Sequence, residues 1–152
     1  MYKIVCVGKI KEQYLADAIN EYVKRIKGFQ KINIIEVKEI NTKDVKFNLK
    51  EEGKNILANI NQDEYVITLE ILGKILDSVE IAKKIEQVQT YGKSVITFVI
   101  GGSNGLDEEV KKRSDFAWSF SKLTFPHQLM RVMLVEQIYR LLTINNNKEY
   151  HK

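Results

Sequence analysis

The chain has 152 residues, of which 44% are hydrophobic and 29% are charged. This composition is typical of globular proteins and excludes a disordered or fibrous chain, and the length suits one domain over residues 1–152. No run approaches the roughly 18 consecutive apolar residues of a membrane-spanning helix, and the beginning of the chain lacks a cleavage-site pattern. We therefore expect a cytoplasmic protein without a membrane anchor.

The charge is unevenly distributed along the chain, although the net charge is only +4. Residues 61–110 contain 4 basic and 9 acidic side chains, whereas residues 111–152 contain 8 and 3. A basic segment can bind a phosphate backbone, but lysine-rich surfaces are also common in proteins without such a partner. Cys6, the only cysteine, lies in an apolar run, and we expect a buried thiol with no redox or metal-binding role.

Hydrophobic periodicity predicts alternating strands and helices. In chain order they are a strand at Tyr2–Val7, a helix at Glu12–Lys27, a strand at Ile32–Val37, a helix at Val45–Ile60, a strand at Tyr65–Ile71, a helix capped by Ser78 and running to Thr90, a strand at Ser94–Ile100, a short helix after Gly105, a weaker strand at Phe116–Phe120 and a helix from Pro126 to Ile144. This alternation favours an α/β fold, with a mostly parallel sheet covered by helices on both faces.

The last predicted helix is apolar on most of its circumference. One face of a sheet covers only one side of a helix. We therefore infer that part of this helix packs against another subunit.

A glycine-rich turn, Gly101–Gly105, directly follows the strand at Ser94–Ile100. Open α/β sheets bind ligands at the carboxyl ends of their strands, and glycine lets a ligand approach the backbone closely. A plain tight turn explains these glycines equally well. The dinucleotide-binding spacing Gly-x-Gly-x-x-Gly is missing, and the acidic Asp107–Glu109 would repel a pyrophosphate, so a nucleotide-dependent oxidoreductase is disfavoured.

A polar and aromatic loop, Ser119–Phe125, precedes the last helix, which Pro126 is expected to begin. His127 and Arg131 are four residues apart, so both project from one face of that helix beside the loop. Taken alone, His127 is more often a structural histidine and Arg131 a structural ion-pair partner. The loop and these two side chains are nevertheless candidates for ligand binding.

Two features near the end of the chain have a similar double interpretation. Glu136 and Arg140 have the spacing of an ordinary helical ion pair, or of a pair that contacts a partner. The terminal Tyr150, His151 and Lys152 are expected to fray by default. An aromatic ring, an imidazole and a cation are also the groups that stack on a base and bind a phosphate.

Five motifs together carry a specific resemblance to a known family. They are Val7-Gly8-Lys9, Gly101–Leu106, Ser119–Arg131, Glu136–Arg140 and the terminal Tyr150-His151. On these motifs the chain resembles, over its whole length, the large-subunit ribosomal RNA methyltransferase H family. The segment that ends at Arg131 is more specific than any glycine pattern.

The resemblance implies a single SPOUT methyltransferase domain, an α/β fold whose carboxyl-terminal part forms a deep trefoil knot. It also implies a homodimer that binds S-adenosylmethionine in the knot, needs no metal, and methylates N3 of a pseudouridine in helix 69 of 23S ribosomal RNA within the assembled ribosome. Carried over by position, the cofactor contacts are Leu69, Gly101, Phe120, Ser121, Lys122, Leu123, Thr124 and Phe125.

The resemblance also suggests catalytic residues. N3 of a uracil-like base must lose a proton before it attacks a methyl group, so the protein must align the reactants and help to remove that proton. Our hypothesis is that Arg131 orients the base or stabilises its developing anion. Tyr150 and His151 of the partner subunit would cover the base, with His151 as a proton acceptor because an imidazole can take up a proton near neutral pH. His127 and water are competing acceptors.

The sequence departs from the family pattern at two places. Glu70 replaces a frequent aspartate and keeps its charge, and Asn145–Glu149 replaces a stretch that often contains glycine and proline. The second departure leaves the conformation of the tail open. The alternative function is a non-catalytic module of the same fold that binds RNA or the ribosome.

Overall fold

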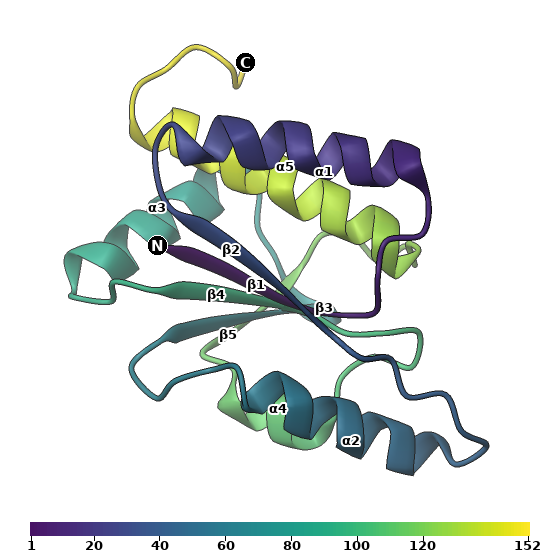
Figure 1. The fold of residues 1–152 in the computed structure, drawn as a ribbon. Coiled ribbons are helices and arrows are strands. Elements are labelled where there is room, and N and C mark those ends of the chain that lie inside the picture. The colour runs from purple at the N-terminus through teal and green to yellow at the C-terminus, as the bar shows by residue number, and fades with distance from the viewer.

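The computed structural model describes residues 1–152 and contains five strands that alternate with five helices (Figure 1). The strands are β1 (Tyr2–Val7), β2 (Ile32–Val37), β3 (Tyr65–Ile75), β4 (Ile96–Ile100) and β5 (Phe116–Ser119). The helices are α1 (Gln13–Lys27), α2 (Val45–Leu57), α3 (Ser78–Thr90), α4 (Glu108–Arg113) and α5 (His127–Asn145). Every predicted element is present; the largest differences are that β3 is longer and α2 shorter than predicted.

All five strands form one parallel sheet in the order β2-β1-β4-β3-β5. In Figure 1, α1, α3 and α5 cover one face of this sheet, and α2 and α4 cover the other. The strands β1 and β4 are buried at every residue, as expected for parallel strands covered on both faces. The predicted α/β fold is therefore confirmed.

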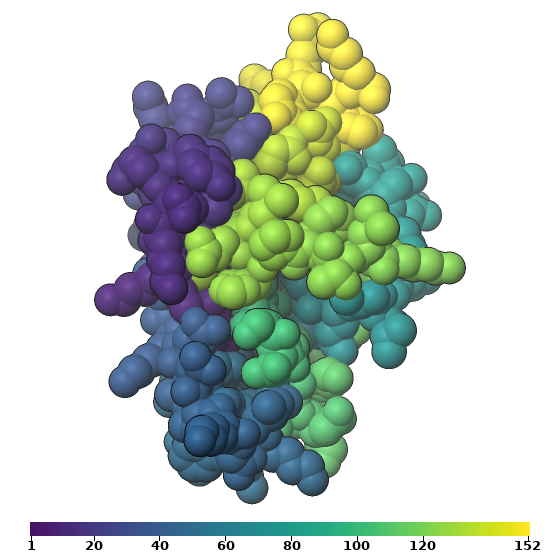
Figure 2. All heavy atoms as spheres, turned by 90° about the vertical axis from the view of Figure 1, so that its right-hand side faces the viewer, coloured from purple at the N-terminus to yellow at the C-terminus, as the bar shows by residue number.

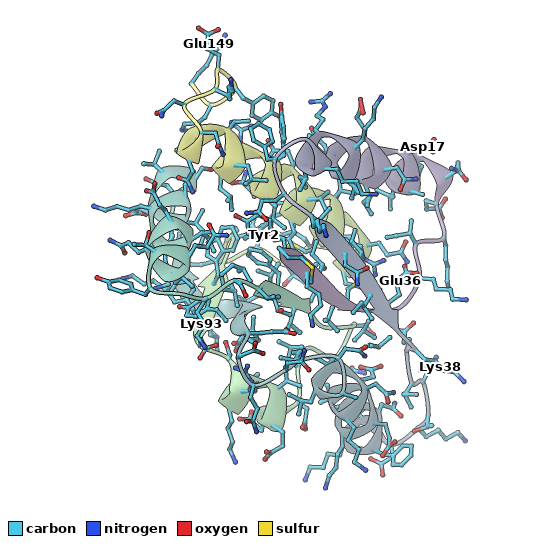
Figure 3. All side chains as sticks on the ribbon, turned by 60° about the vertical axis from the view of Figure 1, so that its left-hand side comes forward. Tyr2, Asp17, Glu36, Lys38, Lys93 and Glu149 are labelled. Atoms are coloured by element: carbon cyan, nitrogen blue, oxygen red, sulfur yellow. The ribbon has the colours of Figure 1, made fainter.

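Each face of the sheet has its own hydrophobic core. The core beside α1, α3 and α5 contains 18 buried residues, including Tyr2, Phe98 and Trp118, and Figure 3 shows Tyr2 inside this layer. The core beside α2 and α4 contains 8. Cys6 lies in the larger core, where burial raises its pKa to about 11. The prediction of a buried thiol is confirmed, and such a thiol is unreactive at neutral pH.

The strand β3 extends beyond its predicted end at Ile71 and contains a bulge. Trp118 of β5 pairs with both Leu69 and Lys74, so the residues between them bulge out of the ladder. Within this bulge the side chain of Leu72 is 98% exposed. The chain returns at Gly73, where a Cβ atom would lie 2.7 Å from the carbonyl carbon of Ala117. Only glycine fits this close approach, and periodicity alone does not predict it.

Two predicted helix starts need small corrections. Asp77, not Ser78, caps α3, because its carboxylate accepts the Glu80 N–H while the Glu80 side chain accepts the Asp77 N–H. The Ser78 hydroxyl instead donates to Gln137 of α5 at 2.8 Å. Pro126 is the cap of α5 and not its first helical residue.

The last helix, α5, is covered largely by its own chain. It packs against α1, α3 and the sheet, and it buries Leu134, Val135, Ile138 and Leu141 completely. Much of its apolar circumference is therefore covered within the chain, and the contact with another subunit stays a prediction. No helix of the structure combines the length and apolarity needed to cross a membrane.

The carboxyl end of α5 closes through a left-handed residue. Asn147 has a φ of 54°. The Lys148 N–H donates to the Thr143 carbonyl at 2.9 Å, and the Asn147 N–H donates to the Ile144 carbonyl at 3.2 Å. These two bonds form a Schellman motif, in which glycine is usual and asparagine is tolerated. The Asn145–Glu149 stretch thus ends the helix as a glycine would.

Candidate functional site

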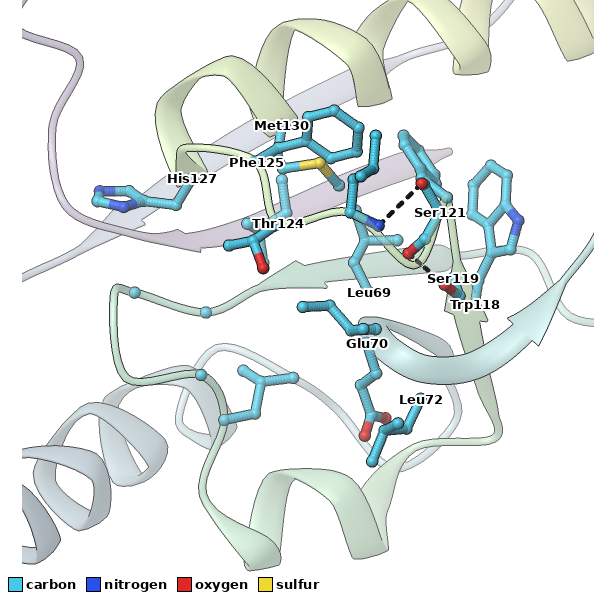
Figure 4. A pocket seen from close by; sticks show the side chains of 18 of the residues that line it. Leu69, Glu70, Leu72, Trp118, Ser119, Ser121, Thr124, Phe125, His127 and Met130 are labelled. Atoms are coloured by element: carbon cyan, nitrogen blue, oxygen red, sulfur yellow. Dashed lines mark hydrogen bonds between the residues drawn. The ribbon is translucent and has the colours of Figure 1, made fainter.

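A cavity of about 680 Å³ opens at the carboxyl ends of β3, β4 and β5. This volume lies within the usual range for small-molecule sites. Figure 2 looks onto this edge of the sheet, where the Gly101–Gly105 turn lies beside the start of α5, and Figure 4 shows the cavity from close by. Carboxyl ends of parallel strands are the usual ligand-binding edge, so the cavity lies where the sequence places a ligand.

The Gly101–Gly105 turn forms one wall of the cavity. Gly102 and Gly105 bridge to each other, and Gly105 has a φ of +84°. A Cβ atom on Gly101 would lie 2.8 Å from the Gly105 carbonyl carbon and would also overlap its oxygen. Gly101 is therefore required for the tight turn itself, and the turn presents backbone to the cavity. The tight-turn interpretation of these glycines is confirmed, and the close approach of a ligand to this backbone stays a prediction.

The loop between β5 and α5 forms the opposite wall. Its fold is held by side-chain to backbone bonds: the Ser119 hydroxyl donates to the Ser121 carbonyl at 3.0 Å, and the Ser121 hydroxyl accepts the Leu123 N–H at 3.0 Å. The loop residues that line the cavity are Phe120, Ser121, Leu123, Thr124 and Phe125. Lys122 is exposed and does not line it.

The bulge of β3 and the residue before it contribute Leu69, Glu70, Ile71 and Leu72 to the lining. The Glu70 carboxylate accepts the Thr68 hydroxyl at 2.6 Å, which fixes the acid at the rim. The predicted cofactor residues thus surround one cavity, with the exception of Lys122.

His127 and Arg131 leave the same face of α5 but have different surroundings. His127 lines the cavity, and its Nε2 lies 3.8 Å from the position of a Cβ atom on Gly8. Arg131 is 2% exposed and does not line the cavity. Its Nη1 is 2.5 Å from Glu36, and its Nη2 donates to the Gly8 carbonyl at 2.9 Å. Arg131 is therefore the structural ion-pair partner that its sequence position alone suggested.

A buried carboxylate lies on the other side of the Gly101–Gly105 turn. Glu52 of α2 is buried, and its Oε2 accepts the Ile40 N–H at 2.9 Å. Burial raises the pKa of Glu52, while that hydrogen bond and the nearby His127 counteract the rise. No sequence signal points to Glu52 or Glu36, because each lies among ordinary surface charges in a helix or strand pattern.

The terminal residues fold back onto α5 instead of fraying. The Glu136 carboxylate accepts hydrogen bonds from Arg140 at 2.5 and 3.0 Å and from the Tyr150 hydroxyl at 3.1 Å. Arg140 also contacts His151 Nδ1 at 3.2 Å, and the Tyr150 ring packs on Tyr139. Burial, the neighbouring Tyr22 hydroxyl and Glu136 raise the pKa of Tyr150 to about 12. Tyr150 is therefore a neutral phenol at physiological pH.

This terminal cluster lies at the opposite end of α5 from His127, as the course of α5 in Figure 1 shows. Within one chain, Tyr150 and His151 do not line the cavity. The structure thus brings His127 to the cavity and leaves the two tail residues apart from it. No group of three or more histidine, cysteine, aspartate or glutamate side chains is arranged to hold a metal ion.

Comparisons with known proteins agree on one family. The model of the family described as "Predicted SPOUT methyltransferase" matches residues 1–151. A ribosomal RNA large subunit methyltransferase H of Lysinibacillus sphaericus is 50% identical over 155 aligned residues, which cover 98% of each chain.

Two solved structures share the fold at low sequence identity. A probable methylase family protein from Haemophilus influenzae has a TM-score of 0.56 and 14% identity over 99% of this chain and 70% of its own. A tRNA (m1G37) methyltransferase from Aquifex aeolicus has a TM-score of 0.57 and 16% identity over 91% of this chain and 69% of its own.

Proposed function

Because the chain belongs to the ribosomal RNA large subunit methyltransferase H family of SPOUT methyltransferases, we propose that it methylates N3 of a pseudouridine in helix 69 of 23S ribosomal RNA. The methyl donor is S-adenosylmethionine, and the substrate is the assembled ribosome in the cytoplasm. The observation that carries the proposal is the cavity at the carboxyl edge, lined by the residues that the family resemblance assigns to the cofactor. The trefoil knot and the single domain over residues 1–152 are part of the same proposal.

The cavity fits the chemistry of this cofactor. Its apolar lining includes Leu69, Leu106, Phe120 and Phe125, which suit an adenine ring and an aliphatic chain. The backbone of the Gly101–Gly105 turn and of the β5–α5 loop offers amide and carbonyl groups for the polar parts. Lys122 is best placed to contact the cofactor through its backbone, because its side chain is exposed.

When bound, S-adenosylmethionine supplies an already activated methyl group. The cavity walls restrict the orientation of that group, which is an entropic contribution to the rate. His127 lines the cavity and is the imidazole within this chain that can hold or accept the N3 proton. Arg131 does not line the cavity, so we give it an indirect role in place of contact with the base. It is a positioning residue that fixes Gly8, against which His127 lies.

A homodimer would bring the tail to the cavity of its partner. The support for a subunit contact is the exposed apolar side chains of Ile71, Leu72, Ile75 and Val79, which are 50%, 98%, 54% and 50% exposed. Such a concentration is unusual on the surface of a monomer. Tyr150 and His151 of one subunit would then cover the base held by the other, with His151 and His127 as alternative proton acceptors.

The test is methyl transfer to ribosomes that lack the helix 69 methyl group, with tritiated S-adenosylmethionine and mapping of the labelled nucleotide by mass spectrometry. The expected result is one label at N3 of a pseudouridine in helix 69. A label at another nucleotide refutes the proposed substrate, and the absence of any label refutes the proposed methyltransferase activity. Deletion of Tyr150–Lys152 should abolish transfer and spare cofactor binding, whereas full transfer by that variant would exclude a role for the tail.

The alternative is a non-catalytic module of the same fold that binds RNA or the ribosome. It would bind ribosomes without affinity for the methyl donor. Calorimetric titration with S-adenosylmethionine separates the two, because the enzyme must bind this donor in the cavity.

A further inference from the structure

The loops at the carboxyl edge of the sheet carry opposite charges on the two sides of the cavity. Lys9 and Lys11 follow β1, and Lys38 and Lys43 follow β2. All four side chains are exposed, and we name them together the basic rim. On the other side of the cavity, the acidic run Asp107–Glu109 begins α4.

The four ammonium groups of the basic rim have no ion-pair partner within the chain. Two acidic side chains of the same region are engaged elsewhere: Glu36 pairs with Arg131, and Asp44 accepts the Phe47 N–H as the cap of α2. Glu12 and Glu39 lie in the same loops and form no ion pair, so the four lysines outnumber the unpaired acids by two. The acids of α4 are instead paired in part with the lysines that follow them in the same helix. Positive charge therefore remains available on the β1 and β2 side.

The two lysine-bearing loops lie side by side and meet the cavity. The Gly8 N–H donates to the Val37 carbonyl at 2.8 Å, so the chain leaves β1 and β2 at neighbouring positions. The Lys11 N–H reaches the Gln128 side chain at 3.4 Å, beside the start of α5. His127, which lines the cavity, lies against Gly8.

The figures show how the rim is presented to solvent. In Figure 2 the loop after β1 lies next to the start of α5 on the viewed face. In Figure 3 Lys38 extends outward from the end of β2. A long polyanion on this face can thus contact the rim and reach the cavity past His127.

We propose that the basic rim binds the sugar-phosphate backbone of the ribosomal RNA next to the target base. This inference rests on the proposed function and adds the path of the RNA. Phosphates are attracted by the rim, whereas the acids Asp107–Glu109 are balanced by the three basic residues that end α4. The RNA therefore approaches the cavity over the loops after β1 and β2. Lysine is a point-charge ligand for phosphate without base preference, so the rim positions the RNA and does not select its sequence.

The test replaces Lys9, Lys11, Lys38 and Lys43 together with glutamine, and measures co-sedimentation with ribosomes that lack the helix 69 methyl group over a series of salt concentrations. If each lysine contacts one phosphate, the slope of log affinity against log salt should fall by about 3, and affinity at low salt should fall by at least about tenfold. Affinity for S-adenosylmethionine should not change, because no lysine of the rim lines the cavity.

A matched control removes the same charge elsewhere. Lys24, Lys27, Lys31 and Lys83 are also exposed and unpaired, and they lie on α1, after it and on α3. Their combined replacement with glutamine should leave the salt slope nearly as in the wild type. Equal losses in both variants would show that only net charge matters and would overturn the inference.

The remaining outcomes separate this inference from the proposed function. An unchanged salt slope in the rim variant overturns the RNA path, even if the wild type transfers methyl groups normally. Loss of the slope in the rim variant alone supports the path, even if the wild type transfers no methyl group and the enzyme proposal fails. Rim-dependent binding to an acidic protein in place of ribosomes would also overturn it.

Discussion

Replacement of Arg131 with methionine distinguishes a positioning role from direct contact with the base. Methionine keeps much of the length and the apolar stem but removes the bonds to Glu36 and to the Gly8 carbonyl. A hydrogen bond from a charged group contributes about 1.5–3 kcal/mol, and an unpaired buried carbonyl costs about 1–3 kcal/mol. The side chain of Glu36 is 38% exposed and can be rehydrated, so loss of its bond to Arg131 should cost an amount at the low end of the first range.

We therefore expect the free energy of unfolding to fall by about 3 kcal/mol, which corresponds to a decrease in Tm of roughly 10 °C for a domain of this size. Urea denaturation followed by Trp118 fluorescence measures the change. At temperatures where the variant is folded, affinity for S-adenosylmethionine should remain within a few-fold of wild type. Arg140→Met is the control, since Arg140 pairs with Glu136 nearer the surface and should cost about 1 kcal/mol or less.

The opposite pattern would refute this reasoning about Arg131. If the methionine variant loses less than about 0.5 kcal/mol of stability, the buried ion pair does not hold the β1 loop. If the Arg131→Met variant in addition loses all methyl transfer while it binds the cofactor normally, Arg131 acts on the base directly.

Three further predictions follow from local geometry. Gly101→Ala should abolish measurable S-adenosylmethionine binding in calorimetry, because its Cβ atom would collide with the backbone across the turn, whereas Gly28→Ala should not affect it; normal binding by the first variant would disprove the assigned wall. Asn147→Val should lower the free energy of unfolding by about 1 kcal/mol or more because a β-branched residue resists a positive φ, and Asn147→Gly should not; equal stabilities would contradict the strain. Burial raises the pKa of Glu64, but hydrogen bonds from Lys3 and Thr97 outweigh it and hold this pKa below its ordinary value of 4.5. The Glu64 carboxylate therefore stabilises the fold above pH 4.5, and this contribution is lost as the pH falls through the lowered pKa. Glu64→Gln should flatten the acid limb of the plot of unfolding free energy against pH, and an unchanged limb would refute the assignment.

The sequence predicted the architecture because the signals for it are local. Apolar residues at periods of two and near four mark strands and helices within a few neighbours of each residue, and an alternation of the two leaves a parallel sheet as the favoured arrangement. The cavity was also predictable, because Gly101–Gly105 and Ser119–Phe125 each follow a strand and the carboxyl ends of parallel strands share one edge.

Only the tertiary structure decided which distant residues meet. The spacing of His127 and Arg131 predicted that both project from one face of the helix. Arg131 is nevertheless buried and pairs with Glu36, which is 95 residues away in the sequence, whereas His127 lines the cavity. The bulge that exposes Leu72 depends on the pairing of β3 with β5. Such contacts depend on strand order and on the packing of elements far apart in the chain, and local sequence patterns do not encode them.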